Sequence, residues 1–305
     1  MSGPPPIRKL GTIDCDMVET TPVAYRGRLW RFEYVRVGHR ENPAGPSHFR
    51  FVDVATGERT PAFAQGRHLG VAYAEGEWMT VFGVPEWGAS RIEGFRSRDL
   101  RTWEAWTALD VPRWGIYNTS VCRGPHGYVM AIELGEPPEE VGVRFTIRFA
   151  ESADLRAWRP LPAECVHTKE RYSACPSIRW LDGHCYMVYL EAMPGPTYET
   201  HIVRSRDLRV WEPSPHNPVL HHSDADKGIA NPALTEAERK KIAGATNLNN
   251  SDMDLCEWRG RTVILYSWGN QQGVEFLAEA SSPMPLASFL RAWFEPTGST
   301  SGDRS

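Results

Sequence analysis

The chain has 305 residues and a formal net charge of -4, with acidic and basic residues interspersed along it. This balance excludes the basic surface that binding to nucleic acids or to anionic membranes requires. No apolar run approaches the length of a membrane-spanning helix, and the first residues lack the apolar segment of a signal peptide. We therefore expect a cytoplasmic protein with no membrane partner.

The composition favours strands over helices. Aromatic residues make up 11% of the chain, including 12 Trp, and Gly and Pro account for 26 and 24 residues. This mixture is typical of many short strands joined by turns, so we expect an all-β protein. The 6 cysteines are scattered and form no CxxC pair, which favours buried, reduced thiols over disulfides.

One motif occurs three times. The pattern Ser-x-Asp-Leu-x-x-Trp covers residues 97–103, 152–158 and 205–211, with its aspartates 55 and 53 residues apart. We expect each Asp to cap a turn through its side chain, while the Leu and Trp pack back onto a sheet. Three copies at nearly constant spacing indicate a structural repeat.

Five predicted hairpins accompany the motif. Their turns contain the glycines Gly27, Gly76, Gly127, Gly183 and Gly260. The first three intervals, of 49, 51 and 56 residues, each suit one four-stranded sheet, whereas the last interval of 77 residues holds an insert at 213–248. Within the insert, residues 235–242 predict a short capped helix that ends near Gly244. Five repeated sheets predict a five-bladed β-propeller, closed by radial repetition, with this helical insert between blades four and five.

The repeats also bound the domain. We predict a single domain over residues 1–305, because the repeated sheets cover most of the chain. The ordered core is expected at about 12–290. The small and polar residues at 299–305 predict a disordered tail.

Superposing the hairpin glycines, with one or two extra residues allowed in blades three and four, aligns the polar residues that precede each turn. The first aligned set is Glu19, His68, Tyr117, Ser173 and Asp252. The second aligned set is Thr21, Gly70, Thr119, Cys175 and Asp254. Side chains alternate along a strand, so both sets share the face that looks into the channel of a propeller. Carboxylates come only from the first and last blades, which are neighbours when the ring closes.

We therefore expect Glu19, Asp252 and Asp254 on one side of the channel. Clustered like charges raise at least one pKa, which suits a general acid. Two structural alternatives stay open. Asp252 and Asp254 would then cap a strand entry or hold a structural cation, and Glu19 would be a solvated loop carboxylate.

The three turns, the five hairpins and the segment 217–220 (Asn-Pro-Val-Leu) together resemble the five-bladed β-propeller glycoside hydrolases of families 43, 32 and 117, over about residues 12–290. The resemblance implies cleavage of a glycosidic bond by a carboxylate from the first blade and an acid from a later one. The sequence departs from family 43 at both places. Thr21 stands where the base Asp is expected before Pro22, and Ala174 stands where the acid Glu is expected before Pro176.

Glycoside hydrolysis requires two groups, one to protonate the leaving oxygen and one to activate water or attack the sugar. The candidate catalytic residues are Glu19, Asp252, Asp254, His68 and Glu191. We assign the role of base or nucleophile to Asp252 or Glu19. The other carboxylate of this pair, or His68, is the acid, since an imidazole can donate a proton at neutral pH. An inverting mechanism is favoured.

Other polar and aromatic residues near the predicted channel suit sugar binding. These candidates are Tyr117, Asn118, Tyr172, Ser173, Trp268 and Gln271. The aromatic members equally suit packing between blades. We expect no cofactor, because no zinc motif is complete; a structural calcium ion bound through Asp224, Asp226 or Asp252 is the alternative.

The leading hypothesis is a glycoside hydrolase of carbohydrate metabolism that acts on a small oligosaccharide or glycoside. A lyase or isomerase of secondary metabolism on the same scaffold is a second hypothesis. A carbohydrate-binding propeller without catalysis is a third. The sequence leaves the sugar, the linkage and the oligomeric state open.

Overall fold

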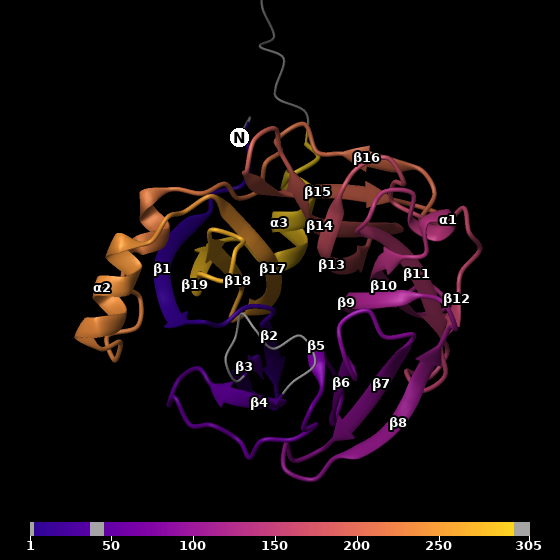
Figure 1. Cartoon of the computed structure of the whole chain (residues 1–305), viewed down its shortest axis with the longest axis horizontal. Coiled ribbons are helices and arrows are strands. Elements are labelled where there is room, and N and C mark those ends of the chain that lie inside the picture. The colour runs from indigo at the N-terminus through magenta and orange to yellow at the C-terminus, as the bar shows by residue number, and fades with distance from the viewer. Residues whose placement is uncertain (1–2, 37–45, 296–305) are drawn as a thin grey trace, which may run out of the picture.

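A computed structural model describes residues 3–36 and 46–295 of the chain (Figure 1). Most of the elements in these residues are strands, and they form antiparallel sheets, which confirms the all-β prediction. The predicted tail at 299–305 lies outside the described residues. So do residues 37–45 within the predicted core.

Three sheets are built from consecutive strands. The first contains β2 (Thr21–Tyr25), β3 (Arg28–Arg36) and β4 (Ser47–Asp53). The second contains β5 (His68–Glu75), β6 (Trp78–Val84), β7 (Arg91–Ser97) and β8 (Glu104–Asp110). The third contains β9 (Gly115–Gly124), β10 (Gly127–Glu136), β11 (Thr146–Ser152) and β12 (Arg159–Pro160).

The remaining strands form one larger sheet made of two antiparallel groups. One group contains β13 (Ser173–Leu181), β14 (His184–Ala192), β15 (Tyr198–Ser205) and β16 (Trp211–Pro213). The other contains β17 (Asn249–Trp258), β18 (Arg261–Gly269), β19 (Glu275–Ser282) and β1 (Arg8–Cys15). A parallel pair, Tyr198 with Asn249, joins the two groups.

The first strand of the chain completes a group formed by its last strands, because β1 pairs antiparallel with β19. The hairpin pattern did not predict this pairing. Figure 1 shows the antiparallel groups following one another around a central axis, with β2, β5, β9, β13 and β17 innermost. Segments far apart in the chain thereby meet at the centre.

All five predicted hairpins are present. The pairs that close their two-residue turns are Tyr25–Arg28, Glu75–Trp78, Gly124–Gly127, Leu181–His184 and Trp258–Arg261. The first turn has positive φ at both central residues, Arg26 at 50° and Gly27 at 72°. Such turns match the right-handed twist of the strands on either side.

The repeated Asp residues cap turns, as predicted. Asp99 Oδ1 accepts the backbone N–H groups of Arg101 and Thr102, each at 2.8 Å. Asp154 and Asp207 accept the equivalent pairs of N–H groups. The leucine after each Asp is buried, and the tryptophans pack against neighbouring aromatic rings. The motif therefore fixes the connection between the third and fourth strands of a group.

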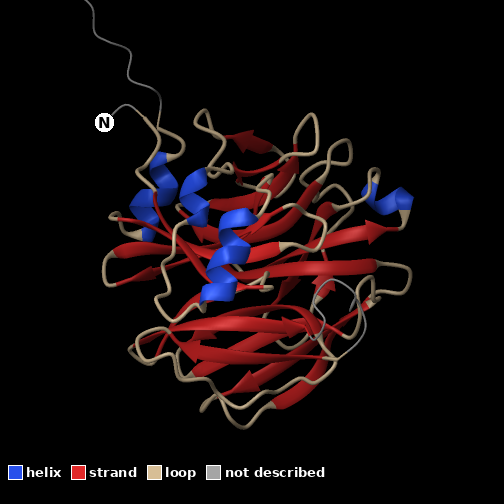
Figure 2. Ribbon diagram, turned by 60° about the vertical axis from the view of Figure 1, so that its left-hand side comes forward, coloured by secondary structure: helices blue, strands red, loops and turns tan. Residues whose placement is uncertain are grey.

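Helices are few, as Figure 2 shows. In the described residues the α-helices are α1 (Pro138–Val141), α2 (Glu236–Gly244) and α3 (Leu286–Ala292), and a short 3-10 helix, η2 (Asp224–Lys227), lies in the insert. At the start of α2, Thr235 and Glu238 each accept a hydrogen bond from the other's backbone N–H, which confirms the predicted capped helix in the insert. Among the described residues, no helix has the length and apolar character needed to cross a membrane.

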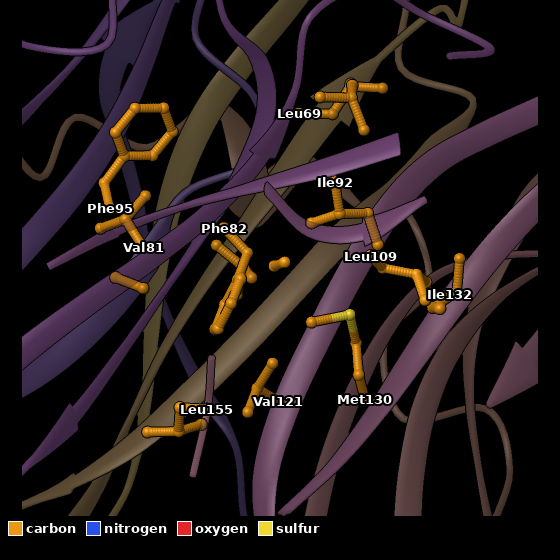
Figure 3. Packing of buried hydrophobic residues seen from close by; sticks show 14 of the residues in the cluster. Leu69, Val81, Phe82, Ile92, Phe95, Leu109, Val121, Met130, Ile132 and Leu155 are labelled. Carbon is orange, nitrogen blue, oxygen red and sulfur yellow. The ribbon is translucent and has the colours of Figure 1, made fainter. Parts of the chain in front are cut away.

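Apolar side chains fill the space between neighbouring sheets. Figure 3 shows Phe82, Ile92 and Leu109 of the second sheet beside Val121 and Met130 of the third, all of them buried. Burying one such side chain stabilises the fold by about 1.5–3 kcal/mol. This packing holds the inner strands in fixed relative positions, and so it positions the side chains at the centre.

Candidate active site

Equivalent positions on the five inner strands follow from the closing pairs of the hairpins. Positions are counted back from the last residue of the inner strand, which is the first member of each closing pair. Six positions before it lie Glu19, Leu69, Asn118, Cys175 and Asp252. We call them the upper ring. The residues four positions before it are Thr21, Val71, Ser120, Ser177 and Asp254. We call them the lower ring.

The glycine-based alignment is right for the first and last inner strands and wrong for the other three. His68, Tyr117 and Ser173 are not equivalent to Glu19, since the upper-ring residues of those strands lie one or two positions later. The reason is that the glycine does not hold a constant place in the turn. Gly76 is the first turn residue, whereas Gly27 is the second.

Four of the five upper-ring residues have an irregular backbone conformation. Glu19, Leu69, Cys175 and Asp252 have φ values of 48°, 52°, 49° and 50°, in the left-handed region. The pairing registers of β5, β13 and β17 shift at these positions. Non-glycine residues adopt this conformation at a cost of about 1–3 kcal/mol, and such strain is concentrated at functional sites.

The upper ring borders two connected spaces. A cavity of about 350 Å³ is lined by Glu19, Cys175 and Asp252 together with side chains such as Arg36 and Trp87. A narrower space of about 40 Å³ continues inward and is lined by all five inner strands. The first and last parts of the chain thus contribute carboxylates to one cavity, as the sequence predicts.

Glu19 and Asp252 differ in their hydrogen bonds. Glu19 Oε2 is buried and has no hydrogen-bond partner among the described residues. Burial raises the pKa of Glu19 well above its usual value; the Arg36 charge lowers it, and the negative charge of Asp252 raises it further. A proton on Glu19 removes the cost of burying a charge without donors.

Asp252 has donors that favour its ionised form. The Ser251 hydroxyl donates to Asp252 Oδ2 at 2.6 Å, and the Cys175 thiol also donates to this carboxylate. Burial raises the pKa of Asp252, but both hydrogen bonds oppose the shift. When the two carboxyl groups share one proton, the proton therefore resides on Glu19.

A third carboxyl group, Glu133 on β10, lies beside the pair and was not predicted. Its Oε2 accepts the Cys175 backbone N–H at 2.7 Å and the Asn118 side-chain amide at 3.0 Å. Burial raises the pKa of Glu133 to about 7, and the charge of Asp252 adds to the shift. One sequence signal was available, because Glu133 is a lone carboxylate within the apolar segment 128–134.

His68 lies behind the cavity and does not line it. The ring is fully buried, and its Nδ1 is 2.5 Å from the Tyr34 hydroxyl. Trp87 Nε1 donates to the same hydroxyl at 3.4 Å. Burial, followed by the charge of Glu19, raises the pKa of Tyr34, so this phenol is a neutral neighbour of Glu19. Tyr34 thus connects the His68 ring to Trp87, which lines the cavity.

Asp254 is in the channel but is held by protein groups. The Ser177 hydroxyl donates to its Oδ1 at 2.6 Å, and Arg179 Nη2 forms an ion pair with it at 2.8 Å. Glu191 lines neither space; it accepts hydrogen bonds from Tyr189 at 2.6 Å and from Arg171 at 2.9 Å. These contacts suit structural roles better than proton transfer.

Three predicted sugar-binding residues line the cavities. Asn118 lines the narrow space, and Tyr172 and Gln271 line the wider one. Asn118 also donates to Glu133, which fixes the orientation of its amide. These side chains supply donors and acceptors for hydroxyl groups.

The other three predicted sugar-binding residues are elsewhere. Trp268 is fully buried, donates to Thr12 Oγ1 at 2.9 Å and stacks on Phe276, so it is a core residue. Ser173 is buried with its hydroxyl 3.1 Å from His167 Nδ1. Tyr117 does not line either space.

Asp226, one of the predicted calcium ligands, is engaged by protein groups. Asp226 is fully buried, pairs with Lys9 at 2.7 Å and accepts from Tyr266 at 2.8 Å. Within residues 3–36 and 46–295, no group of three or more His, Cys, Asp or Glu side chains is arranged to hold a metal ion. The calcium alternative stays a prediction.

No protein family model and no curated protein matches the chain. Solved structures do match it. The BT0996 RGII complex has 13% identity and a TM-score of 0.65, and the match covers 93% of this chain and 93% of that one. The alpha-L-arabinofuranosidase from Lactobacillus brevis has 10% identity and a TM-score of 0.59, covering 90% of this chain and 92% of that one.

A third match is the Bombyx mori GH32 beta-fructofuranosidase BmSUC1, with 11% identity and a TM-score of 0.56, covering 86% of this chain and 59% of that one. A thermostable family-43 glycoside hydrolase also matches. Identities this low show a shared fold alone. The chain therefore has the fold of the family 43 and family 32 glycoside hydrolases, which confirms the resemblance at the level of the fold.

Proposed function

We propose that this protein is a glycoside hydrolase that cleaves a small oligosaccharide or glycoside in the cavity above Glu19 and Asp252. In this proposal the five antiparallel groups are the blades of a five-bladed propeller, and the cavity is its central pocket. The observation that carries the proposal is a pair of carboxyl groups lining one cavity: among the described residues, Asp252 has hydrogen-bond donors and Glu19 Oε2 has none. The shared fold with glycoside hydrolases supports it.

The two carboxyl groups have different roles. Glu19 holds the proton and gives it to the glycosidic oxygen as the bond to the anomeric carbon breaks. Asp252 is ionised and takes a proton from a water molecule, whose oxygen forms the new bond to the anomeric carbon. After the reaction Asp252 releases its proton to solvent and Glu19 regains a proton from solvent. Attack by water from the opposite face inverts the configuration of the sugar.

Neighbouring groups support this division. Arg36 lines the same cavity and lowers the pKa of both carboxyl groups, so it stabilises negative charge as the reaction proceeds. The Trp87 ring also lines the cavity and offers an apolar face for a sugar ring. Tyr172 and Gln271 offer hydrogen bonds to its hydroxyl groups.

Assays with nitrophenyl glycosides and small oligosaccharides test the proposal. On a substrate that the wild type hydrolyses, Asp252→Asn and Glu19→Gln are expected to lower kcat by about 10²–10⁴-fold, with unchanged circular dichroism. The exposed Asp224→Asn is the matched control and retains activity. An active Asp252→Asn variant removes Asp252 from the mechanism. Sugar binding without turnover supports a binding module, and an unsaturated product supports a lyase.

A further inference from the structure

The channel continues beyond the acidic site. Asp254 borders both the narrow space under the upper ring and a second cavity of about 440 Å³, which we call the lower cavity. Arg179 pairs with Asp254 at 2.8 Å and also donates to the Leu255 carbonyl group, so it bridges β13 and β17. Both residues of this bridge line the lower cavity, whereas Glu19 and Asp252 do not.

The walls of the lower cavity are mainly apolar. Residues from all five inner strands line the lower cavity. Residues of α3, which lies close to β17 in Figure 1, line it as well. Aliphatic side chains on these elements are Val23, Val71, Val121, Leu181, Leu286 and Leu290. A cavity of this size and character is in the range that binds small organic molecules.

Four charged side chains line the lower cavity, two positive and two negative: Arg123, Arg179, Asp254 and Glu257. Arg179 is paired with Asp254, Arg123 is paired with Glu75, and Glu257 accepts the backbone N–H of Leu286. Cys122 and Cys256 also line the cavity, and burial raises the pKa of each to about 12, so both thiols are neutral. An anionic ligand would lose its hydration without gaining an unpaired arginine, since both arginines among the described lining residues are already in ion pairs.

The Tyr73 hydroxyl is a polar group that a ligand can use. The Tyr73 side chain lines the lower cavity, and its hydroxyl makes no hydrogen bond to any of the described residues. Burial raises the pKa of Tyr73, so the phenol stays protonated and can donate or accept one hydrogen bond. Its ring packs edge-on against Tyr128 at 6.0 Å, which holds it in place.

We propose that the lower cavity is a second ligand site, for a neutral and mainly apolar molecule with one hydroxyl or carbonyl group that hydrogen-bonds Tyr73. Aromatic and alicyclic alcohols are the class that fits this combination of walls and partner. The site is separate from Glu19 and Asp252, and the proposal does not depend on hydrolysis.

Cys256 is a direct reporter because it is half-buried and lines only the lower cavity, whereas Cys175 lines only the upper spaces. Naphthol is the probe, and naphthalenesulfonate is its charged control. Alkylation by N-ethylmaleimide is followed for each cysteine by peptide mass spectrometry. Naphthol is expected to slow modification of Cys256 by at least about fivefold and to leave Cys175 unchanged, and the sulfonate is expected to protect neither.

Two variants locate the binding. Tyr73→Phe removes the hydroxyl and keeps the volume, and it is expected to weaken naphthol binding by about 2–10-fold. Ala287→Trp places an indole on the cavity wall and is expected to abolish the protection of Cys256. Ala233→Trp, at an exposed position of the insert, is the control and keeps it. Equal protection by naphthol and sulfonate, no protection of Cys256, or full protection in Tyr73→Phe each overturns the proposal.

Discussion

The Cys175 thiol donates a hydrogen bond to the carboxylate of Asp252. The backbone N–H of Cys175 donates to Glu133 Oε2 at 2.7 Å. One residue in a left-handed conformation thus ties two buried carboxyl groups together across neighbouring sheets. The protonation state of Asp252 therefore depends on Cys175, and Glu133 helps to hold Cys175 in position.

Cys175→Ala removes the thiol donor and is expected to raise the pKa of Asp252. A base must be ionised, so the acidic limb of the kcat/KM profile moves to higher pH, by about one pH unit. Cys175→Ser keeps a donor and keeps the wild-type profile. Cys15→Ala, at a half-buried cysteine outside both upper spaces, is the control. An unchanged limb in Cys175→Ala means that the thiol does not influence the base.

Glu133 makes stability depend on pH. Its folded-state pKa of about 7 is above the ordinary value of 4.5, so the folded protein binds its proton more tightly than the unfolded chain. The stabilisation from this proton is complete below pH 4.5 and is lost as pH rises through 7. For a fully buried group the loss is about 3 kcal/mol.

The glutamine side chain of Glu133→Gln does not titrate. The free energy of unfolding of this variant therefore does not decrease between pH 4.5 and pH 7 on account of this position. Relative to wild type, the variant is expected to gain up to about 3 kcal/mol between pH 4.5 and pH 7.5. Urea unfolding at a series of pH values measures the difference. The exposed Glu170→Gln serves as the control and shows a difference that does not vary with pH. A constant difference for Glu133→Gln would mean that Glu133 is ionised throughout.

Local patterns predicted the elements well. Some elements depend on contacts between a side chain and the backbone a few residues away, and such contacts can be predicted from local sequence. They include the turns capped by Asp99, Asp154 and Asp207 and the start of the helix at Thr235. The convergence of Glu19 and Asp252 on one cavity also followed, because their hairpin turns have the same form.

Positions that depend on contacts between sheets were harder to predict. Leu69 and Cys175 enter the upper ring through bulges that no periodic pattern reveals. Trp268 has the residue type of a sugar-stacking platform, but Thr12 on the distant strand β1 holds its ring in the core. Glu133 lies on a second strand, outside the set of inner strands that the hairpin alignment compared.

Asp254→Asn separates a structural role from a catalytic one. The substitution removes the ion pair that neutralises Arg179, and breaking a buried pair on one side costs about 3 kcal/mol. We expect a lower unfolding midpoint in urea and a kcat within about threefold of wild type. Asp254→Asn combined with Arg179→Met is expected to recover part of the stability. A loss of kcat as large as that of Asp252→Asn would instead assign Asp254 to the mechanism.

The position of β1, which pairs with β19, depends on a glycine. Gly11 has a φ of 109°, and a Cβ atom there would lie 2.3 Å from the Gly228 carbonyl oxygen. The neighbouring Thr12 N–H donates to the same oxygen at 2.7 Å, so the two backbones cannot separate without losing this bond. Gly11→Ala is therefore expected to cost about 3 kcal/mol.

The matched control is Gly76→Ala, which places a Cβ atom in open space at a φ of 57°. Only the cost of the left-handed conformation applies there, about 1 kcal/mol. Urea unfolding of both variants gives the comparison. Because β1 pairs with β19, the larger loss in Gly11→Ala should coincide with faster amide exchange in both strands. Equal costs for the two variants would show that β1 adds little to the closure of the fold.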